Sequence, residues 1–465
     1  MKPTRRTRLL SLTALLLAVV LMISACGPAL PSGPSGAPET EPSAALPGIP
    51  SSAPAQAVPT SAEPPAPSAA PTEPAVVNVD AVRDLMEGIT ARAAKIRPAD
   101  ETFRQSQLSF ALELARAQAG GRGNLLISPL SVMTALAMTA NGAAGENLRQ
   151  MEQVLGSGMP IAQLNEYLST YLNGLPSAPN ARFTFADSVW LRSDITASVV
   201  PEFLQTNADY YDAAVYAAPF TPETVARIND WVSEKTDKMI PKLVDQLGRD
   251  TVMVLLNALV FDARWASPYE DSTVSKGSFR TVTGLRPAEF MTSTEPFYLQ
   301  AAGATGFLKT YEGGTYAFAG LLPAEGQSPE ELLKELTAQE LGRALASPER
   351  AAVRVRLPKF SYDWEGELSP SLQTMGMPAA FSAGADFSRM LPGAYISQVI
   401  HKTRIEVTQD GTRAAAVTAV IVDRSVSVPP AIQYTVTLDR PFVYMIIDMQ
   451  TRLPVFLGIV NDIAS

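Results

Sequence analysis

The spacing of apolar residues changes along this chain from a helical period to a strand-like alternation, and no other feature constrains the fold as strongly. Apolar residues recur at helical spacing in five mostly early segments: 103–118, 128–140, 146–155, 160–172 and 221–243. Strand patterns interleave with these and dominate the last third: 182–191, 252–261, 353–360, 395–408, 432–438, 442–449 and 455–460. Helices gathered early and antiparallel strands gathered late predict an α+β fold, with large sheets covered by helices.

Composition separates a globular body from the segment before it. Residues 98–465 contain no Pro-rich break, so we expect one large domain there, although the length alone would allow two. Residues 27–75 are almost entirely Pro, Ala, Ser, Gly and Thr, with four Glu and no Lys, Arg or aromatic residue. Such a segment cannot bury enough apolar surface to fold, so we interpret residues 26–97 as a tether that reaches at least about 40 Å. Within it, residues 76–97 have some helical periodicity, and whether they pack on the domain stays open.

Residues 1–25 have the features of a lipoprotein signal peptide. Basic residues come first, a largely apolar run follows from 9 to 23, and small residues precede Cys26, as in a bacterial lipobox. We therefore expect Cys26 to carry lipid and to anchor a secreted chain to the outer face of a bacterial membrane, extracellular or periplasmic. An ordinary signal peptide or a short transmembrane anchor is the alternative, although the apolar run is short for a span.

Two residue counts exclude several kinds of site. Cys26 is the only cysteine and His401 the only histidine in the chain. An intrachain disulfide, a cysteine nucleophile in the globular part, a thiolate zinc cluster and a His-rich metal site are therefore excluded, and we expect no bound metal. The formal net charge of −9 at pH 7, without an evident basic patch, argues against a nucleic-acid partner.

The sequence lacks the common catalytic motifs. It contains no Walker-type phosphate loop, no dinucleotide glycine fingerprint, no GxSxG elbow and no SxxK motif. His401 lies inside a strand pattern, which favours a buried, hydrogen-bonded structural histidine over a catalytic base. We therefore expect no enzymatic activity and no catalytic residue, with a hydrolase built around His401 as the weaker alternative.

Several motifs occur in a fixed order along the globular part. The chain has NLLISPLS at 124–131, LNALVF at 256–261 with Trp265 after it, LPKF at 357–360, ISQVIHK at 396–402, RPF at 440–442 and FLG at 456–458. In this order they resemble the signature segments of the serpins, the serine protease inhibitor superfamily. The resemblance covers essentially all of residues 100–462.

The resemblance implies a serpin fold of three β-sheets and eight or nine helices, with an exposed reactive-centre loop near the C-terminus. In that family a serine protease cleaves the loop, and the freed loop inserts into the central sheet while the acyl-enzyme is still attached. We therefore expect a surface-tethered, monomeric inhibitor that needs no cofactor. The alternative is a non-inhibitory binding or scaffolding lipoprotein with the same fold. Four residues match the polar cluster that the family keeps beneath the opening strands: Ser128, Ser131, Asn257 and His401.

The hinge of the expected loop consists of small or β-branched residues. Its eight residues are Gly411, Thr412, Arg413, Ala414, Ala415, Ala416, Val417 and Thr418. In an inserted strand alternate side chains point to opposite faces, so Arg413 and Asp423 share one face and the uncharged set that includes Thr412 shares the other. If the charged set faces solvent, insertion buries no unpaired charge. Pro and bulky residues, usual in family members that have lost inhibition, are absent from 412–418, which favours an inhibitor.

The position of the cleaved bond has two assignments, and both stay open. A loop of the usual length counted from Gly411 places the bond between Ser425 and Val426, which suits an elastase-like protease. A loop one residue shorter places it between Arg424 and Ser425, which suits the acidic pocket of a trypsin-like protease. Chemistry slightly favours Arg424.

Three residues depart from the family pattern. Gln409 replaces a Glu that commonly pairs with the lysine of LPKF, here Lys359, so that ion pair is missing. Arg413 replaces another common Glu, and Arg440 replaces the usual His before Pro-Phe. We expect the change at Gln409 to ease opening of the sheet, so that Gln409→Glu raises thermal stability.

Overall fold

The computed structural model describes residues 81–120, 123–175, 181–248, 250–412 and 431–463. All of them belong to the second of the two units into which the chain divides, Pro74–Ser465. Within these ranges, no helix combines the length and the apolar character that a bilayer span requires.

Nine α-helices lie within the described residues. They are α1 Glu101–Gln118, α2 Pro129–Ala140, α3 Gly145–Gly156, α4 Ile161–Gly174, α5 Pro201–Tyr211, α6 Pro222–Lys235, α7 Pro329–Glu335, α8 Ala338–Ala346 and α9 Ser369–Met375. Side-chain caps define several starts: the Asp100 carboxylate accepts a hydrogen bond from the backbone N–H of Phe103, and the Ser128 hydroxyl accepts one from Ser131. The helix predicted over 221–243 ends at Lys235, because Asp237 and Lys238 adopt a positive φ that a helix cannot continue through.

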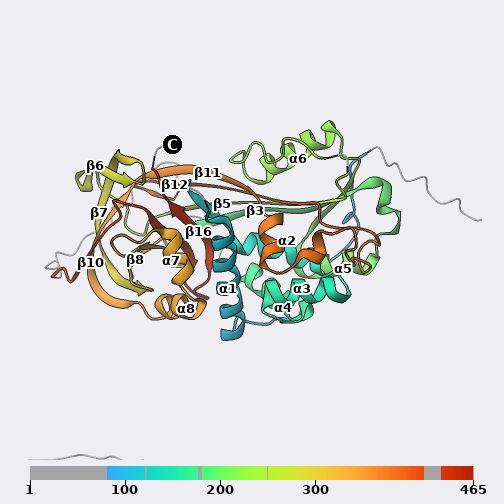
Figure 1. Ribbon diagram of the computed structural model, residues 1–465, viewed down its shortest axis with the longest axis horizontal. Coiled ribbons are helices and arrows are strands. Elements are labelled where there is room, and N and C mark those ends of the chain that lie inside the picture. The colour runs from blue at the N-terminus through green and yellow to red at the C-terminus, as the bar shows by residue number, and fades with distance from the viewer. Residues whose placement is uncertain (1–80, 121–122, 176–180, 249, 413–430, 464–465) are drawn as a thin grey trace, which may run out of the picture. The chain divides into compact units, whose positions relative to one another are not determined.

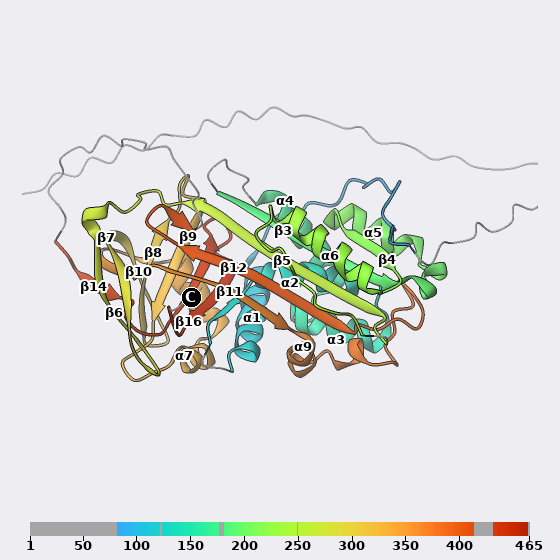
Figure 2. The same cartoon turned by 90° about the horizontal axis from the view of Figure 1, so that it is seen from above.

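A seven-stranded sheet forms the centre of this unit. Its strands are, in order, β1 (Arg83–Asp84), β4 (Ala214–Ala218), β3 (Ala181–Arg192), β5 (Met253–Arg264), β13 (Gly411–Thr412), β12 (Gln398–Val407) and β11 (Phe360–Glu367). Helix α6 lies on one face of the sheet, and α1 to α5 lie on the other (Figure 1). The view from above shows β3, β5, β12 and β11 side by side, with α6 over the β3 side of the sheet (Figure 2).

A nine-stranded sheet contains the remaining strands. Its main path is β14 (Tyr434–Thr437), β10 (Glu349–Pro358), β7 (Gly284–Ala301), β8 (Ala304–Thr310), β9 (Tyr316–Leu322), β15 (Phe442–Asp448), β16 (Pro454–Val460) and β2 (Leu125–Ile127), while β6 (Val274–Thr281) pairs with β7. The described residues thus form two hydrogen-bonded sheets, whereas the resemblance implies three. The long strand β7 joins what would be separate sheets, because it pairs with β6 over residues 284–291, with β10 over 290–298 and with β8 over 298–301.

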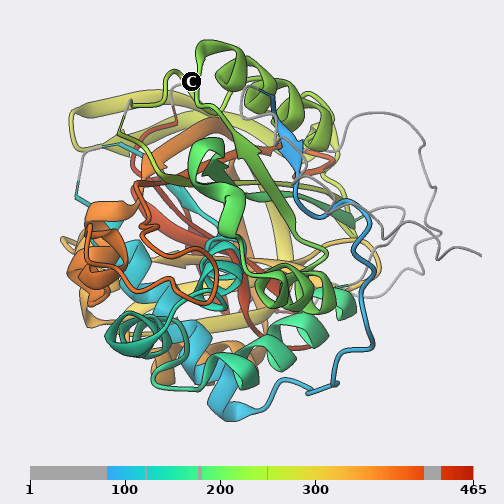
Figure 3. The ribbon, with the colours of Figure 1, turned by 90° about the vertical axis from the view of Figure 1, so that its right-hand side faces the viewer.

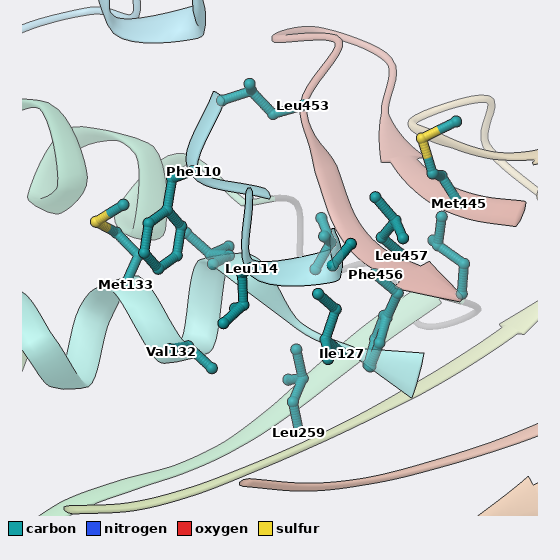
Figure 4. Close-up of a cluster of buried hydrophobic side chains, with 14 of the residues drawn as sticks. Phe110, Leu114, Ile127, Val132, Met133, Leu259, Met445, Leu453, Phe456 and Leu457 are labelled. Atoms are coloured by element: carbon teal, nitrogen blue, oxygen red, sulfur yellow. The ribbon is translucent and has the colours of Figure 1, made fainter. Parts of the chain in front are cut away.

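Alternate residues of β5 enter two different hydrophobic cores. Met253, Leu255 and Leu259 face the main core with the helices and the nine-stranded sheet. Figure 4 shows Leu259 there beside side chains of α1, α2, β2 and β16. Val254, Leu256, Ala258 and Val260 point to the other face. They belong to a second core that includes Ile228 and Val232 of α6. Because both faces are covered, this strand lacks polar alternation, in agreement with its continuous apolar run.

Residues 81–97, which the sequence places in the tether, pack against the globular body. Strand β1 pairs with β4, and the backbone N–H of Leu85 donates to the Val215 carbonyl at 2.8 Å. Arg92 forms an ion pair with Asp209 of α5, and Arg97 forms one with Glu166 of α4. Figure 3 shows this segment in blue, running down the side of the body. Its helical periodicity does not produce a helix, and the folded body extends N-terminally beyond the predicted start at residue 98.

Candidate functional site

The seam between β5 and β12 is the candidate site. From Val254 to Val260, β5 pairs directly and in parallel with β12. Above this ladder, β13 enters between the two strands: Thr412 is paired with Ala263 of β5 and with Val407 of β12, antiparallel on both sides. Two residues of the predicted hinge therefore already occupy the upper end of the seam. The other hinge residues, Arg413 to Thr418, lie outside the described residues, as do Cys26, Arg424, Ser425 and Val426.

Close backbone packing fixes Gly411 at the entrance of the seam. A Cβ atom at this position would lie 2.1 Å from the carbonyl oxygen of Ala263, far inside a normal contact distance. The next residue, Thr412, is 1% exposed, and its hydroxyl is 2.6 Å from the hydroxyl of Tyr311. Since Thr412 points into the protein, the alternation of a continuing strand would place Arg413 on the opposite face.

An aromatic cluster supports the turn that precedes β13. Trp265 stacks on Tyr311 with ring centroids 4.4 Å apart, and its indole N–H donates to the Thr408 carbonyl at 2.9 Å. The backbone N–H groups of Trp265 and Tyr269 donate to the carbonyls of Asp410 and Gln409, each at 2.9 Å. The tryptophan of the family motif therefore holds the turn through its ring and its backbone.

A buried ion pair lies beneath this aromatic cluster, and no sequence motif indicated it. The Lys309 ammonium is 3.0 Å from a Glu295 carboxylate oxygen, and the two side chains are 3% and 9% exposed. The same ammonium lies 4.3 Å from the centre of the Tyr269 ring. Burial and the neighbouring Glu295 carboxylate raise the pKa of Tyr269 well above its usual value. Such a pair is costly to break, because removing one partner leaves a buried charge.

The contacts of Gln409 alter the expectation for this position. Its amide oxygen accepts a hydrogen bond from the Lys359 ammonium at 2.6 Å, and Lys359 forms its ion pair with Glu289 instead, at 2.8 Å. The amide nitrogen of Gln409 donates to the Asp271 carboxylate at 2.8 Å. A glutamate here would therefore face Asp271 with a like charge, so the gain in stability expected for Gln409→Glu does not follow from this geometry.

The four predicted cluster residues come together where α2 begins below the seam. The backbone N–H of Ser128 donates to His401 Nε2 at 2.9 Å, and His401 Nδ1 is 3.2 Å from the Asn257 carbonyl oxygen. Desolvation lowers the pKa of His401 to about 3, so the ring is neutral at pH 7, with its proton on Nδ1. Both ring nitrogens are occupied by backbone groups, which leaves neither of them to accept a proton from a nucleophile.

Asp187 of β3 is a fifth member of this cluster that the sequence analysis missed. Its Oδ1 accepts hydrogen bonds from the Ser131 hydroxyl and from the Asn257 amide, each at 2.7 Å, and Asn257 also donates to Ser131 at 2.5 Å. Desolvation raises the pKa of Asp187 to about 8, against the opposing effect of the Ser131 hydrogen bond. The signal available in the sequence was a lone carboxylate within the strand pattern 182–191.

The first turn of α2 holds both sides of the seam. Ser128 binds His401 on β12, whereas Ser131 binds Asp187 on β3 and Asn257 on β5. Inserting a strand would separate β5 from β12 by about another 4.8 Å, the spacing of neighbouring strands. One rigid helical turn cannot follow both strands, so the hydrogen bonds to one side must break. This cluster therefore resists opening of the seam.

Comparison with known proteins identifies relatives of the whole globular part. The family model described as "Serpin (serine protease inhibitor)" matches residues 105–463. A putative serpin-Z12 of Oryza sativa subsp. japonica is 33% identical over 399 residues, covering 78% of this chain and 92% of that protein. Alpha-1-antiproteinase 2 of Equus caballus is 28% identical over 379 residues, covering 78% and 88%.

Solved structures match the fold along nearly their full length. The native state of tengpin, described as a thermophilic serpin, is 40% identical, with a TM-score of 0.78, and the match covers 82% of this chain and 99% of that one. Its latent state gives 37% identity and a TM-score of 0.70, covering 79% and 100%. By this measure the described arrangement is more similar to the native-state structure.

Proposed function

The chain belongs to the serpin family, whose members in general inhibit serine proteases, and we propose that this one traps its protease by inserting a cleaved loop into the β5–β12 seam. In this proposal a serine protease cleaves the bait bond and stays attached to the loop as an acyl-enzyme. The freed segment after Thr412 then continues β13 downward between the two strands. The protease is carried across the molecule, and its active site is distorted.

One observation carries this proposal: Thr412 already pairs with both strands of the seam, and Gly411 before it pairs with β5. Insertion would replace the parallel β5–β12 ladder with two antiparallel ladders, the pairing that is slightly more stable per residue. About a dozen residues gain hydrogen bonds worth roughly 0.5–1.5 kcal/mol each, in addition to the burial of Val and Ile, which gives on the order of 10 kcal/mol. That gain favours the inserted form and makes the uncleaved chain metastable.

The proposal includes the bait bond and the membrane anchor. Cleavage falls after Arg424 for a trypsin-like protease or after Ser425 for an elastase-like one. Mass spectrometry of the released C-terminal fragment separates these assignments, since the fragments differ by one residue. Lipid at Cys26 would tether a monomeric inhibitor to the outer face of a bacterial membrane; Cys26→Ser should abolish incorporation of labelled fatty acid.

The test uses residues on opposite faces of the inserted strand. Because Thr412 is buried, alternation places Ala416 on the same buried face and Ala415 on the opposite face. That opposite face carries the partly exposed charged side chains of Lys402 and Arg404 on β12. The chain should form a complex with trypsin or elastase that survives denaturing electrophoresis. Ala416→Arg should yield cleaved inhibitor without a complex, since insertion would bury an unpaired charge. The matched Ala415→Arg variant should retain the complex.

Other outcomes would support other functions. Clean cleavage of the unmodified chain by every protease tested, with no covalent complex, would favour a non-inhibitory binding protein. Turnover of esters or peptides by the chain alone would favour a hydrolase. Equal effects of the two arginine substitutions would contradict insertion in the proposed register.

A further inference from the structure

A cavity of about 360 Å³ lies at the edge of the seven-stranded sheet. Strand β4 begins at Ala214, opposite Ser188, so no described strand covers the edge of β3 before that residue. The walls come from α2, α4, the end of α5, β3 and α6, and three aromatic side chains line them: Phe185, Tyr211 and Trp231. The space is large enough for a small organic molecule with an aromatic body.

Asp187 connects this cavity with the cluster that closes the seam. Its carboxylate lines the cavity, and only Oδ1 accepts hydrogen bonds from Ser131 and Asn257. Oδ2 accepts none from the described residues, which leaves it available to a molecule in the cavity. Two further charged side chains line the space, Asp212 and Lys235, and both belong to exposed residues. Two other titratable residues are nearby. Tyr211 lines the cavity, and His401 contacts the Asn257 carbonyl on the side of the cluster away from Asp187.

We propose that this cavity binds a small primary ammonium compound with an aromatic or apolar body, and that Asp187 is its counter-ion. The carboxyl group is the one charged group of the wall that also belongs to the buried cluster. A cation there would gain the ion pair with Oδ2 and favourable contact with the aromatic faces. The ionised form of Asp187 would repel an anion, and a neutral molecule would offer that form no counter-ion.

Proton release should accompany binding. With its pKa near 8, Asp187 is mostly protonated at pH 7 in the empty cavity, and an ammonium ion nearby favours the ionised form. Each bound cation should therefore displace most of one proton to solvent. Affinity for the cation should rise with pH up to about 8 and then level off, because above that pH the carboxyl group is already ionised.

Occupation of the cavity should also slow opening of the seam. An ionised Asp187 forms stronger hydrogen bonds with Ser131 and Asn257, so α2 holds β3 and β5 more firmly. This second part rests on the proposed loop insertion. The binding part does not, because titration with a ligand detects it even if the chain inhibits no protease.

Titration calorimetry with phenethylamine and its neutral isostere 2-phenylethanol tests the proposal. Phenethylamine should bind at least about tenfold more tightly than the alcohol at pH 8, and its apparent heat should vary with the ionisation enthalpy of the buffer at pH 7. Asp187→Asn should abolish both the preference and the proton release. The matched Asp212→Asn variant, which removes the other carboxylate of the wall, should retain both.

Three results would overturn the site: no binding of the amine, equal binding of amine and alcohol, or an unchanged amine preference in Asp187→Asn. Saturating amine should also slow the formation of the protease complex. An unchanged rate together with confirmed binding would reject only the coupling to the seam. Absence of any protease complex would count against the proposed function and leave the binding result intact.

Discussion

At the scale of single residues, Asp187 links the stability of the fold to pH. An acid whose pKa is raised on folding binds more protons in the folded state, so its contribution to stability is fully present below its unfolded pKa, near 4, and is lost as pH rises through about 8. An asparagine has no charged form and retains an amide that can hydrogen-bond with Ser131 and Asn257. The cost of ionising a buried carboxyl group therefore disappears in Asp187→Asn.

We expect the thermal midpoint of Asp187→Asn, relative to the unmodified chain, to rise with pH. The relative midpoint should increase by about 4–10 °C between pH 5 and pH 9. Scanning calorimetry of the two uncleaved proteins at one scan rate measures this difference in midpoint. The effects of groups that titrate alike in both proteins cancel in the comparison. A difference in midpoint that stays constant with pH would contradict the raised pKa of Asp187.

Gln409 yields a second prediction at this scale, opposite in sign to the one drawn from the sequence. Gln409→Glu exchanges a hydrogen bond to Asp271 for a repulsion, while Lys359 already has Glu289 as its partner. We expect a small decrease in the thermal midpoint, about 1–3 °C. The double variant Gln409→Glu with Asp271→Asn should recover the loss, since the new amide can donate to the new carboxylate. A higher midpoint for the single variant would restore the original expectation.

At the scale of elements, the segment 81–97 acts as a strap over β4, α5 and α4. Its contacts combine β1 pairing, the ion pairs of Arg92 and Arg97, and a hydrogen bond from the Arg97 backbone N–H to the Thr170 hydroxyl at 2.8 Å. Composition distinguishes residues 27–75 from the body, but it could not mark where contact with the body begins. That boundary depends on partners roughly 70 to 130 residues away in the chain.

Removal of the strap should destabilise the body. A chain that starts at residue 98 should unfold about 5 °C or more below one that starts at residue 81, because several hydrogen bonds and buried contacts are lost. Arg92→Ala in the longer chain serves as a control with a small effect, since that arginine side chain is 69% exposed. Equal midpoints for the two lengths would show that the strap contributes nothing to stability.

At the scale of the whole molecule, the proposed function requires that the uncleaved fold is metastable, with its central sheet closed against a more stable inserted arrangement. Cleavage of the bait bond should raise the thermal midpoint by about 12 °C, the effect of roughly 10 kcal/mol in a chain of this size. Calorimetry before and after limited proteolysis measures the change. The cleaved Ala416→Arg variant should show no such rise, and a missing rise in the unmodified chain would favour the non-inhibitory alternative.

The sequence by itself determined several early helices, the central strands and the family to which the chain belongs. Apolar periodicity located the central strands and the early helices, because the residues buried on a face of a helix or strand are apolar and recur at the period of that element. Ordered motifs identified the cluster of Ser128, Ser131, Asn257 and His401, which the fold brings together around the start of α2.

Only the tertiary structure decided what those residues face. Four features join segments distant in sequence: the pairing of Thr412 with two strands, the buried partner of Lys309, the second partner of Gln409, and the place of Asp187 in the polar cluster. Local pattern cannot specify such contacts, because the free energy of a charge or a hinge depends on groups supplied by other elements. The same helical turn that the sequence marked as a cap thus becomes, in the folded chain, the group that holds the seam closed.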